Sequence, residues 1–247
     1  MRAQLRSELL KQRSTTTNLG LFVGMVGLVL FAVVLHSVGL AAEHVDSRTE
    51  QLMVFGRGEF LGALFAALLG ALSITGEIRH GTIRPTSLVT PRRGRVVAAK
   101  LAVSALVGAG FGLAASAAAA GVGAAALAAR GIDIQLDGGD SALLVLGGAG
   151  AAALWAAVGV GVGAVVRSQV PTVVGIAAWL LFVEGVLAGD ALDLTVRRFA
   201  PGAAAEAISG QDPGTLLAPA PAALLLAMYA AAAAAAGWLA TERRDVT

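Results

Sequence analysis

The sequence predicts an all-α membrane protein with six transmembrane helices. Of its 247 residues, 57% are hydrophobic and only 14% are charged, and the mean hydropathy is +0.78. A soluble domain carries about 25% charged residues. The apolar residues also occur in long runs, which are typical of membrane spans, and they lack the polar faces that a soluble helical bundle needs. We therefore expect a single transmembrane domain over residues 1–247.

Residues 1–17 are too polar to cross a bilayer. Ala3, Leu5 and Leu9 share one face of a helix, and charged residues occupy the rest of its circumference. This pattern is typical of an amphipathic helix that lies in the membrane interface. A charged tail that only orients the first span is the alternative. We expect an interfacial helix on the cytoplasmic side.

Six apolar runs follow, and a helix needs about 17–25 such residues to cross a bilayer. The first run is longer than the ~7–15 apolar residues of a cleavable signal sequence, so we expect it to be retained. The second run is short, and it extends back toward Leu52 only if Arg57 and Glu59 lie at the interface. The predicted spans are residues 18–41, 60–76, 99–129, 141–166, 170–189 and 216–240.

The Lys and Arg residues predict the orientation of these spans. With the N-terminus inside, thirteen of the 18 lie on the cytoplasmic side and five on the outer side. Short cytoplasmic loops are enriched in these residues, so both termini are expected in the cytoplasm. A composition rich in Ala, Gly and Arg is typical of the codon bias of GC-rich bacteria. With six predicted spans, we expect a multi-pass protein of a bacterial cytoplasmic membrane. The longest outer segment, 190–215, has a helix-compatible stretch from Pro201 to Ile208.

Pairs of glycines four residues apart occur inside three of the predicted spans. Small residues at this spacing let two membrane helices approach closely. We therefore expect helix packing at Gly20 and Gly24, at Gly108 and Gly112, and at Gly159 and Gly163.

The sequence lacks the common signatures of catalytic and metal sites. It has no cysteine, no HExxH or GxSxG motif, and no GxxxxGK[ST] phosphate loop. The three histidines, His36, His44 and His80, are scattered. We expect no enzyme activity, no metal or cofactor on this chain, and no nucleic-acid partner.

Residues 76–100, GEIRHGTIRPTSLVTPRRGRVVAAK, differ from the apolar sequence on either side. Gly81 is suited to end the second span, because glycine adopts the left-handed conformation without a steric penalty. Thr82 can cap a new short helix, with Pro85 in its first turn. Pro91 then starts the next helix in the same way. The segment predicts a short cytoplasmic surface helix that presents apolar and basic side chains for docking.

This segment resembles the loop between the second and third spans of ABC-2-type transporter permeases, particularly the small actinobacterial ones. The matching positions are Glu77, Gly81, Thr82, Leu88, Pro91, Arg92, Arg93 and Lys100. The motif covers about 25 residues, and the layout of an N-terminal amphipathic helix and six spans covers most of the chain.

The resemblance implies that loop 77–98 carries a coupling helix seated in a groove of a separate ATPase subunit. The residues expected to take part in coupling are Glu77, Gly81, Thr82, Ile83, Arg84, Pro85, Thr86, Leu88, Pro91, Arg92 and Arg93. Two ATPase copies would bind ATP and Mg, and a second permease subunit, identical or paralogous, would complete an exporter.

Two other functions stay open from the sequence: a proton-coupled secondary transporter, and a non-transporting membrane scaffold. A pathway lined by Ala, Gly, Leu and Val suits an amphiphilic or apolar substrate, without choosing among drugs, natural products, lipids and peptides.

Four residues are candidates for that pathway. His36 and Glu184 each lie about five residues from the outer end of their spans, so they can form a pair or share a vestibule. The alternative is that both side chains simply reach the outer interface of the membrane. Trp155 and Trp179 lie mid-span, where they either line a cavity or pack in the core.

Overall fold

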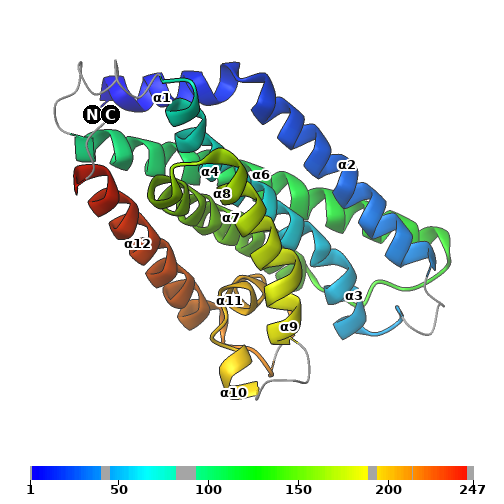
Figure 1. Cartoon of the computed structure of the whole chain (residues 1–247). Helices are drawn as coiled ribbons and strands as arrows, with labels where there is room; N and C mark the ends of the chain where they lie inside the picture. Colours follow the sequence, from blue (N-terminus) through cyan, green and yellow to red (C-terminus); the bar gives the residue numbers. More distant parts are fainter. Residues whose placement is uncertain (1, 40–44, 82–92, 189–193, 213, 244–247) are drawn as a thin grey trace.

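The computed structural model describes residues 2–39, 45–81, 93–188, 194–212 and 214–243, and every regular element within them is helical (Figure 1). The elements are α1 (Arg2–Ser14), α2 (Thr16–Gly39), α3 (Arg48–Phe55), α4 (Arg57–Arg79), α6 (Arg93–Ala129), α7 (Gly138–Val166), α8 (Gln169–Ala178), the π-helical turn η2 (Trp179–Val183), α9 (Glu184–Ala188), α10 (Leu194–Arg197), α11 (Pro201–Ile208) and α12 (Pro219–Arg243).

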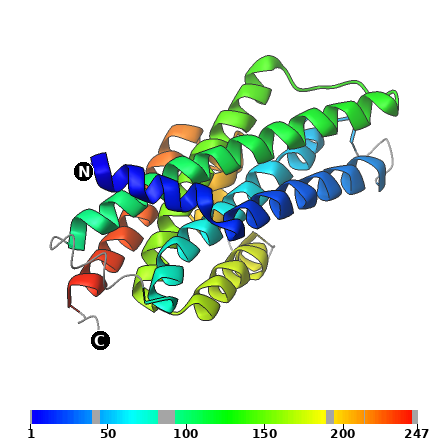
Figure 2. The ribbon, with the colours of Figure 1, turned by 90° about the horizontal axis from the view of Figure 1, so that it is seen from above.

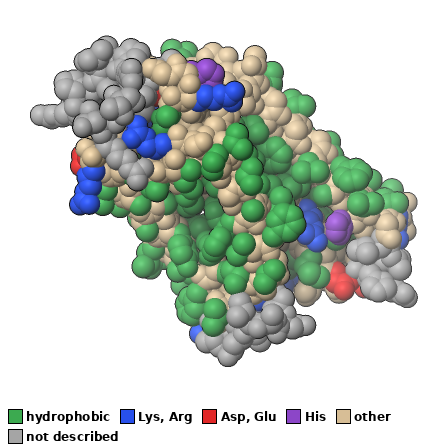
Figure 3. Space-filling model, viewed as in Figure 1, with side chains coloured by type: hydrophobic (Ala, Val, Ile, Leu, Met, Phe, Trp, Pro, Cys, Tyr) green, Lys and Arg blue, Asp and Glu red, His purple; other side chains and the backbone are tan. Residues whose placement is uncertain are grey.

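Six helical segments are long and apolar enough to cross a membrane, which confirms the predicted number of spans. They are Thr16–Gly39, Arg48–Arg79, Val96–Ala129, Gly138–Val166, Gln169–Leu187 and Pro219–Arg243. Hydrophobic side chains cover the middle of the surface seen in Figure 3, and charged side chains lie toward its edges. This distribution is what a protein surrounded by lipid requires.

The second span begins earlier than the sequence predicted. It starts at Arg48 instead of residue 60, because α3 and α4 follow each other with Gly56 between them. Glu59 lies inside this span and is only 2% exposed. The prediction placed the boundary at the charged residues, whereas the structure buries one of them in a protein environment.

Helix α4 lies at the centre of the fold and packs against α6 and α7 (Figure 1). At its crossing with α7 the backbones are in contact. A Cβ atom built on Gly70 would lie 2.0 Å from the carbonyl oxygen of Ala156, and one built on Gly159 would lie 2.0 Å from that of Ala67. Only glycine fits at these two positions, so the two glycines determine how closely α4 and α7 approach each other.

The expected use of paired glycines is confirmed in two of the three spans. A Cβ atom on Gly163 would lie 2.8 Å from Ile74 of α4, and one on Gly112 would lie 2.4 Å from the carbonyl oxygen of Gly148 in α7. The prediction was wrong for Gly20, which has no atom within 4 Å of such a position. Gly20 lies on a face of α2 that has no neighbour among the described residues, whereas Phe22 on another face packs against Phe111.

The helix ends divide the molecule into two regions, which we call the proximal and distal ends. α1, the end of α4, the start of α6 and the end of α12 lie at the proximal end (Figures 1 and 2). Gly94 of α6, for example, packs against Trp238 of α12. At the distal end lie α3, α9, α10 and α11, and α11 occupies the helix-compatible stretch found in the sequence.

Candidate functional site

Four charged side chains from three helices form a closed ring at the proximal end, here called the charge ring. The Nζ atom of Lys11 lies 2.7 Å from Glu8 Oε1 and 2.8 Å from Glu77 Oε1. The Nζ atom of Lys100 lies 2.8 Å from Glu8 Oε2 and 2.8 Å from Glu77 Oε1. Each carboxylate therefore contacts both ammonium groups, and the charges balance within the ring.

Three members of the ring are shielded from solvent. The side chain of Lys100 is 2% exposed, that of Glu8 7% and that of Glu77 12%, whereas Lys11 is 43% exposed. Lys100 also donates a hydrogen bond to the carbonyl oxygen of Ser73, 3.1 Å away. A buried charge is tolerated when it is paired and hydrogen-bonded, and Lys100 meets both conditions.

The ring also changes the acidity of its exposed member. Partial burial acts to lower the pKa of Lys11, but the hydrogen bonds to Glu77 and Glu8 outweigh it and raise that pKa above its ordinary value. Lys11 thus stays protonated to a higher pH than a free lysine, which keeps the ring closed.

Helix α1 contacts the rest of the protein through polar residues. Among residues 4–14, Glu8 and Gln12, one turn apart, are the buried positions, whereas Leu10 is 66% exposed. The predicted N-terminal helix is present. The buried Lys100 pairs with a carboxylate from α1 as well as one from α4, and this pairing determines which side of α1 faces the protein.

The charge ring lies where the predicted coupling loop leaves and re-enters the helices. Glu77 is in the last turn of α4, and Gly81 beyond it has a φ angle of +68°, in the left-handed region that ends helices. Arg93 is the first residue of α6. The remaining predicted coupling residues lie outside the described residues: Thr82, Ile83, Arg84, Pro85, Thr86, Leu88, Pro91 and Arg92.

A cavity of about 540 Å³ opens beside the ring. Its polar wall comes from α1, the start of α2, α4, α6 and the start of α8. It includes Gln12, Asn18, Ser73 and Gln169 together with the four ring residues. The ring is therefore accessible from one side, although most of its members are buried.

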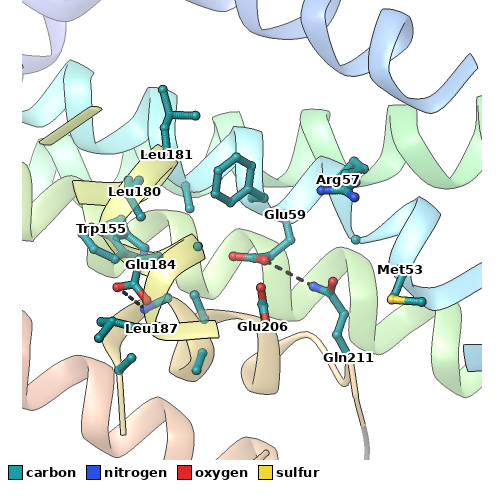
Figure 4. Close-up of a pocket in the computed structure, with 18 of the residues that line it drawn as sticks. Met53, Arg57, Glu59, Trp155, Leu180, Leu181, Glu184, Leu187, Glu206 and Gln211 are labelled. Carbon is teal, nitrogen blue, oxygen red and sulfur yellow. Dashed lines mark hydrogen bonds between the residues drawn. The ribbon is translucent and has the colours of Figure 1, made fainter. Parts of the chain in front are cut away.

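A second cavity, of about 260 Å³, lies at the distal end and is here called the distal cavity (Figure 4). Three carboxyl side chains line it: Glu59 from α4, Glu184 from α9 and Glu206 from α11. Glu59 accepts a hydrogen bond from Gln211 Nε2, 3.2 Å away. Phe60 and Leu180 contribute apolar walls, so the cavity is amphiphilic.

Glu184 connects the fifth candidate span to α11. Its Oε1 atom accepts hydrogen bonds from the Nε1 atom of Trp179 at 2.8 Å and from the backbone N–H of Gly202 at 2.9 Å. The carboxyl group thereby caps the start of α11. In α11, which lies outside the six candidate spans, burial raises the pKa of Glu206 above its ordinary value, although Arg197 acts in the opposite direction.

The structure brings together three of the four predicted pathway residues. Trp155 and Glu184 line the distal cavity, and Trp179 holds Glu184. His36 is elsewhere: its Nδ1 atom lies 2.9 Å from the carbonyl oxygen of Ala32 in its own helix, and its Nε2 atom lies 3.5 Å from Arg57. His36 and Glu184 therefore do not form the pair that was predicted from their similar positions within their spans.

The sequence predictions missed several residues of both sites. Glu8 and Lys11 belong to the predicted interfacial helix, and Lys100 is the motif position that opens the third span, but the sequence did not predict that these residues pair. Glu59 was treated as a boundary, and Glu206 was not singled out. A signal existed for Lys100 and Glu59, because each adjoins a long apolar run where an ionisable side chain needs a partner.

No protein family and no curated protein matches this sequence. The functional interpretation therefore depends on the residues and on their arrangement.

Proposed function

We propose that this chain is the membrane-spanning subunit of an ATP-driven ABC exporter of the ABC-2 type, in a bacterial cytoplasmic membrane. One observation carries this proposal. The charge ring ties α1, α4 and α6 together at the two ends of the segment that resembles a coupling loop. A force applied to that segment would reach three helices at once.

In this proposal both termini and the charge ring face the cytoplasm, as the distribution of Lys and Arg favours. Two copies of a soluble ATPase bind ATP and Mg and grip the coupling segments of two permease subunits, identical or paralogous. ATP favours one conformation of the assembly because it binds that conformation more tightly. The permease changes its accessible side in response.

The test is association with the ATPase subunit that this proposal requires, which is to be sought among the neighbouring genes. Replacing Ile83 and Leu88 together by Asp places charges on the predicted docking surface, where a few central residues usually carry most of the binding energy. We expect the double variant to insert normally, to lose the ATPase during co-purification and to lose ATP-dependent transport. Ile134→Asp, at an exposed position before α7, is the matched control and should retain both. Tight ATPase binding and normal transport in the double variant would contradict the proposal.

The distal cavity favours a second candidate, a proton-coupled secondary transporter. Such proteins use ionisable residues within the membrane region, and Glu59 and Glu184 lie inside candidate spans with Glu206 beside them. Proteoliposomes that contain this chain alone distinguish the two candidates. Uptake driven by a pH gradient without ATPase or ATP supports the second, and transport only with ATPase and ATP supports the first.

A further inference from the structure

Two carboxyl groups meet in the distal cavity, and neither has an ion-pair partner among the described residues. The side chains of Glu59 and Glu206 point toward each other from α4 and α11 (Figure 4). Glu59 is 2% exposed, and its one hydrogen bond among the described residues comes from the neutral amide of Gln211. In the described part of the chain, neither carboxyl group has a Lys, Arg or His partner within 4.0 Å.

The two arginines of the cavity wall are directed to other groups. Arg197 lies 4.0 Å from the carboxylate of Asp212, and an Nη2 atom of Arg57 lies 3.5 Å from His36. Both arginines attract Glu206 from a greater distance. Neither forms an ion pair with the buried Glu59, and a buried carboxylate without an ion-pair partner is strongly disfavoured, so Glu59 requires either a proton or a positively charged ligand.

A second, independent observation indicates a ligand. Trp155 is 4% exposed and lines the same cavity, and its Nε1–H group has no acceptor among the described residues. Buried polar groups are nearly always hydrogen-bonded, and the exceptions are often groups that bind something. Trp155 is therefore a buried donor that lacks an acceptor, in the lining of the cavity that also contains the carboxyl pair.

The chemistry of the cavity selects the class of ligand. No three His, Asp or Glu side chains in the described ranges are close enough to share a metal ion. The apolar walls formed by Phe60, Leu180 and Leu187 suit hydrocarbon. A volume of about 260 Å³ accommodates the polar head of an amphiphile and little more.

We propose that the distal cavity binds an organic ammonium ion that carries a neighbouring oxygen acceptor, with the ammonium between Glu59 and Glu206 and the oxygen facing Trp155. This part of the proposal rests on the proposed export function: the exported substrate is then an amphiphilic amine with a hydroxyl or ether oxygen near the nitrogen. No covalent step is involved.

The experiment measures binding to the purified chain in detergent by calorimetry, without ATPase. The probe is 2-amino-1-phenylethanol, and its two matched analogues are 1-phenyl-1,2-ethanediol, which lacks the charge, and 2-phenylethylamine, which lacks the oxygen. We expect the diol to bind at least tenfold more weakly than the amino alcohol, and the amine to bind several-fold more weakly. Trp155→Phe should remove the difference between the amine and the amino alcohol.

Two isosteric variants complete the test. Glu59→Gln and Glu206→Gln should each weaken binding of the amino alcohol at least tenfold and leave the diol unchanged. Glu242→Gln, an exposed acid at the end of α12, is the control and should bind like the unaltered chain. Unchanged elution and unfolding midpoints show that each variant is folded.

Equal binding of diol and amino alcohol overturns the proposal, as does full binding by Glu59→Gln. If no probe binds, the proposal is also overturned, and protons then neutralise Glu59 and Glu206. Because the assay contains no ATPase, these outcomes do not depend on the exporter assignment, and loss of ATPase association in the coupling variant does not affect them.

Discussion

Glu77 and Lys100 form an ion pair of 2.8 Å, although 22 residues of chain separate them. The pair joins the last turn of α4 to the start of α6, so it closes the base of the segment that contains residues 82–92. Glu8 of α1 contacts the same Lys100. The base of this segment is therefore a fixed structure shared by three helices.

Removal of Lys100 should destabilise the protein strongly. Lys100→Met leaves Glu8 and Glu77 buried with Lys11 alone, and breaking a buried ion pair in this way costs about 3 kcal/mol or more. Adding Glu8→Gln removes the excess charge and should restore more than half of the loss. Unfolding midpoints in mixed micelles, followed by circular dichroism, measure both effects.

Arg48→Met is the control for this pair of variants, because it breaks an exposed ion pair with Asp140. Its midpoint should change little. A similarly small change for Lys100→Met would show that the ring contributes nothing to stability.

The chain has only two lysines, so the ring can be probed by chemical modification. A raised pKa leaves less neutral amine at a given pH, and Lys11 should react several-fold more slowly than a free lysine with an acetylating reagent at pH 8. Glu77→Gln removes a partner that raises this pKa, so the rate should increase, whereas Asp140→Asn at the distal end should have no effect. Mass spectrometry gives the rate at each lysine, and equal rates in all three proteins would contradict the ring.

The same raised pKa sets the sign of a pH effect on stability. The contribution of protonated Lys11 is fully present below the ordinary value of 10.5 and is lost as the pH rises through the higher value in the folded state. Unfolding midpoints between pH 7 and pH 10 should therefore show no loss attributable to Lys11, and an early loss that disappears in Lys11→Met would argue against the assignment.

The crossing of α4 and α7 should tolerate no side chain at Gly159. A Cβ atom there meets the carbonyl oxygen of Ala67 at 2.0 Å, so Gly159→Ala should force the helices apart and lower stability by about 1–3 kcal/mol. Gly150→Ala lies in the same helix with no atom within 4 Å and is the matched control. Equal unfolding midpoints for the two variants would mean that the helices do not cross here.

The two ends of α7 test the orientation in the membrane. A cysteine at Gln135, before α7, should react with an impermeant thiol reagent added outside the cell. Cysteines at Ser168, just after α7, and at Glu242 should react only after the cells are opened. The absence of natural cysteines keeps the background low. Labelling of residues 135 and 168 from the same side would exclude a membrane-spanning α7.

Local sequence properties predicted the helices well, because hydropathy and helix termini depend on neighbouring residues. The six spans and the stretch from Pro201 to Ile208 follow from this. The charge ring could not be predicted, because Glu8 and Lys100 meet over a separation of 92 residues and no local pattern specifies that contact. Glu59 was misplaced for a related reason: an acid near an apolar run marks an interface unless a distant residue buries it.

The predicted candidate site was incomplete for the same physical reason. Trp155 and Glu184 could be predicted because polar atoms are rare within their spans, and both line the distal cavity. Glu206 lies in a short amphipathic segment where an acid is unremarkable in sequence. Its position opposite Glu59 depends on how α11 packs against α4, α7 and α12.

The position of Gly70 makes α4 a lever with unequal arms. Glu59 and Glu77 lie 18 residues apart, which is five full turns, so both lie on the same face of one continuous helix. Measured from the close contact at Gly70, the arm to Glu59 is ~16 Å and the arm to Glu77 is ~10 Å. A rigid α4 that pivots there would turn a 1 Å displacement at Glu77 into an opposite displacement of ~1.6 Å at Glu59. Spin-label distances from α7 to each end of α4 would measure this ratio, and changes in the same direction at both ends would exclude the pivot.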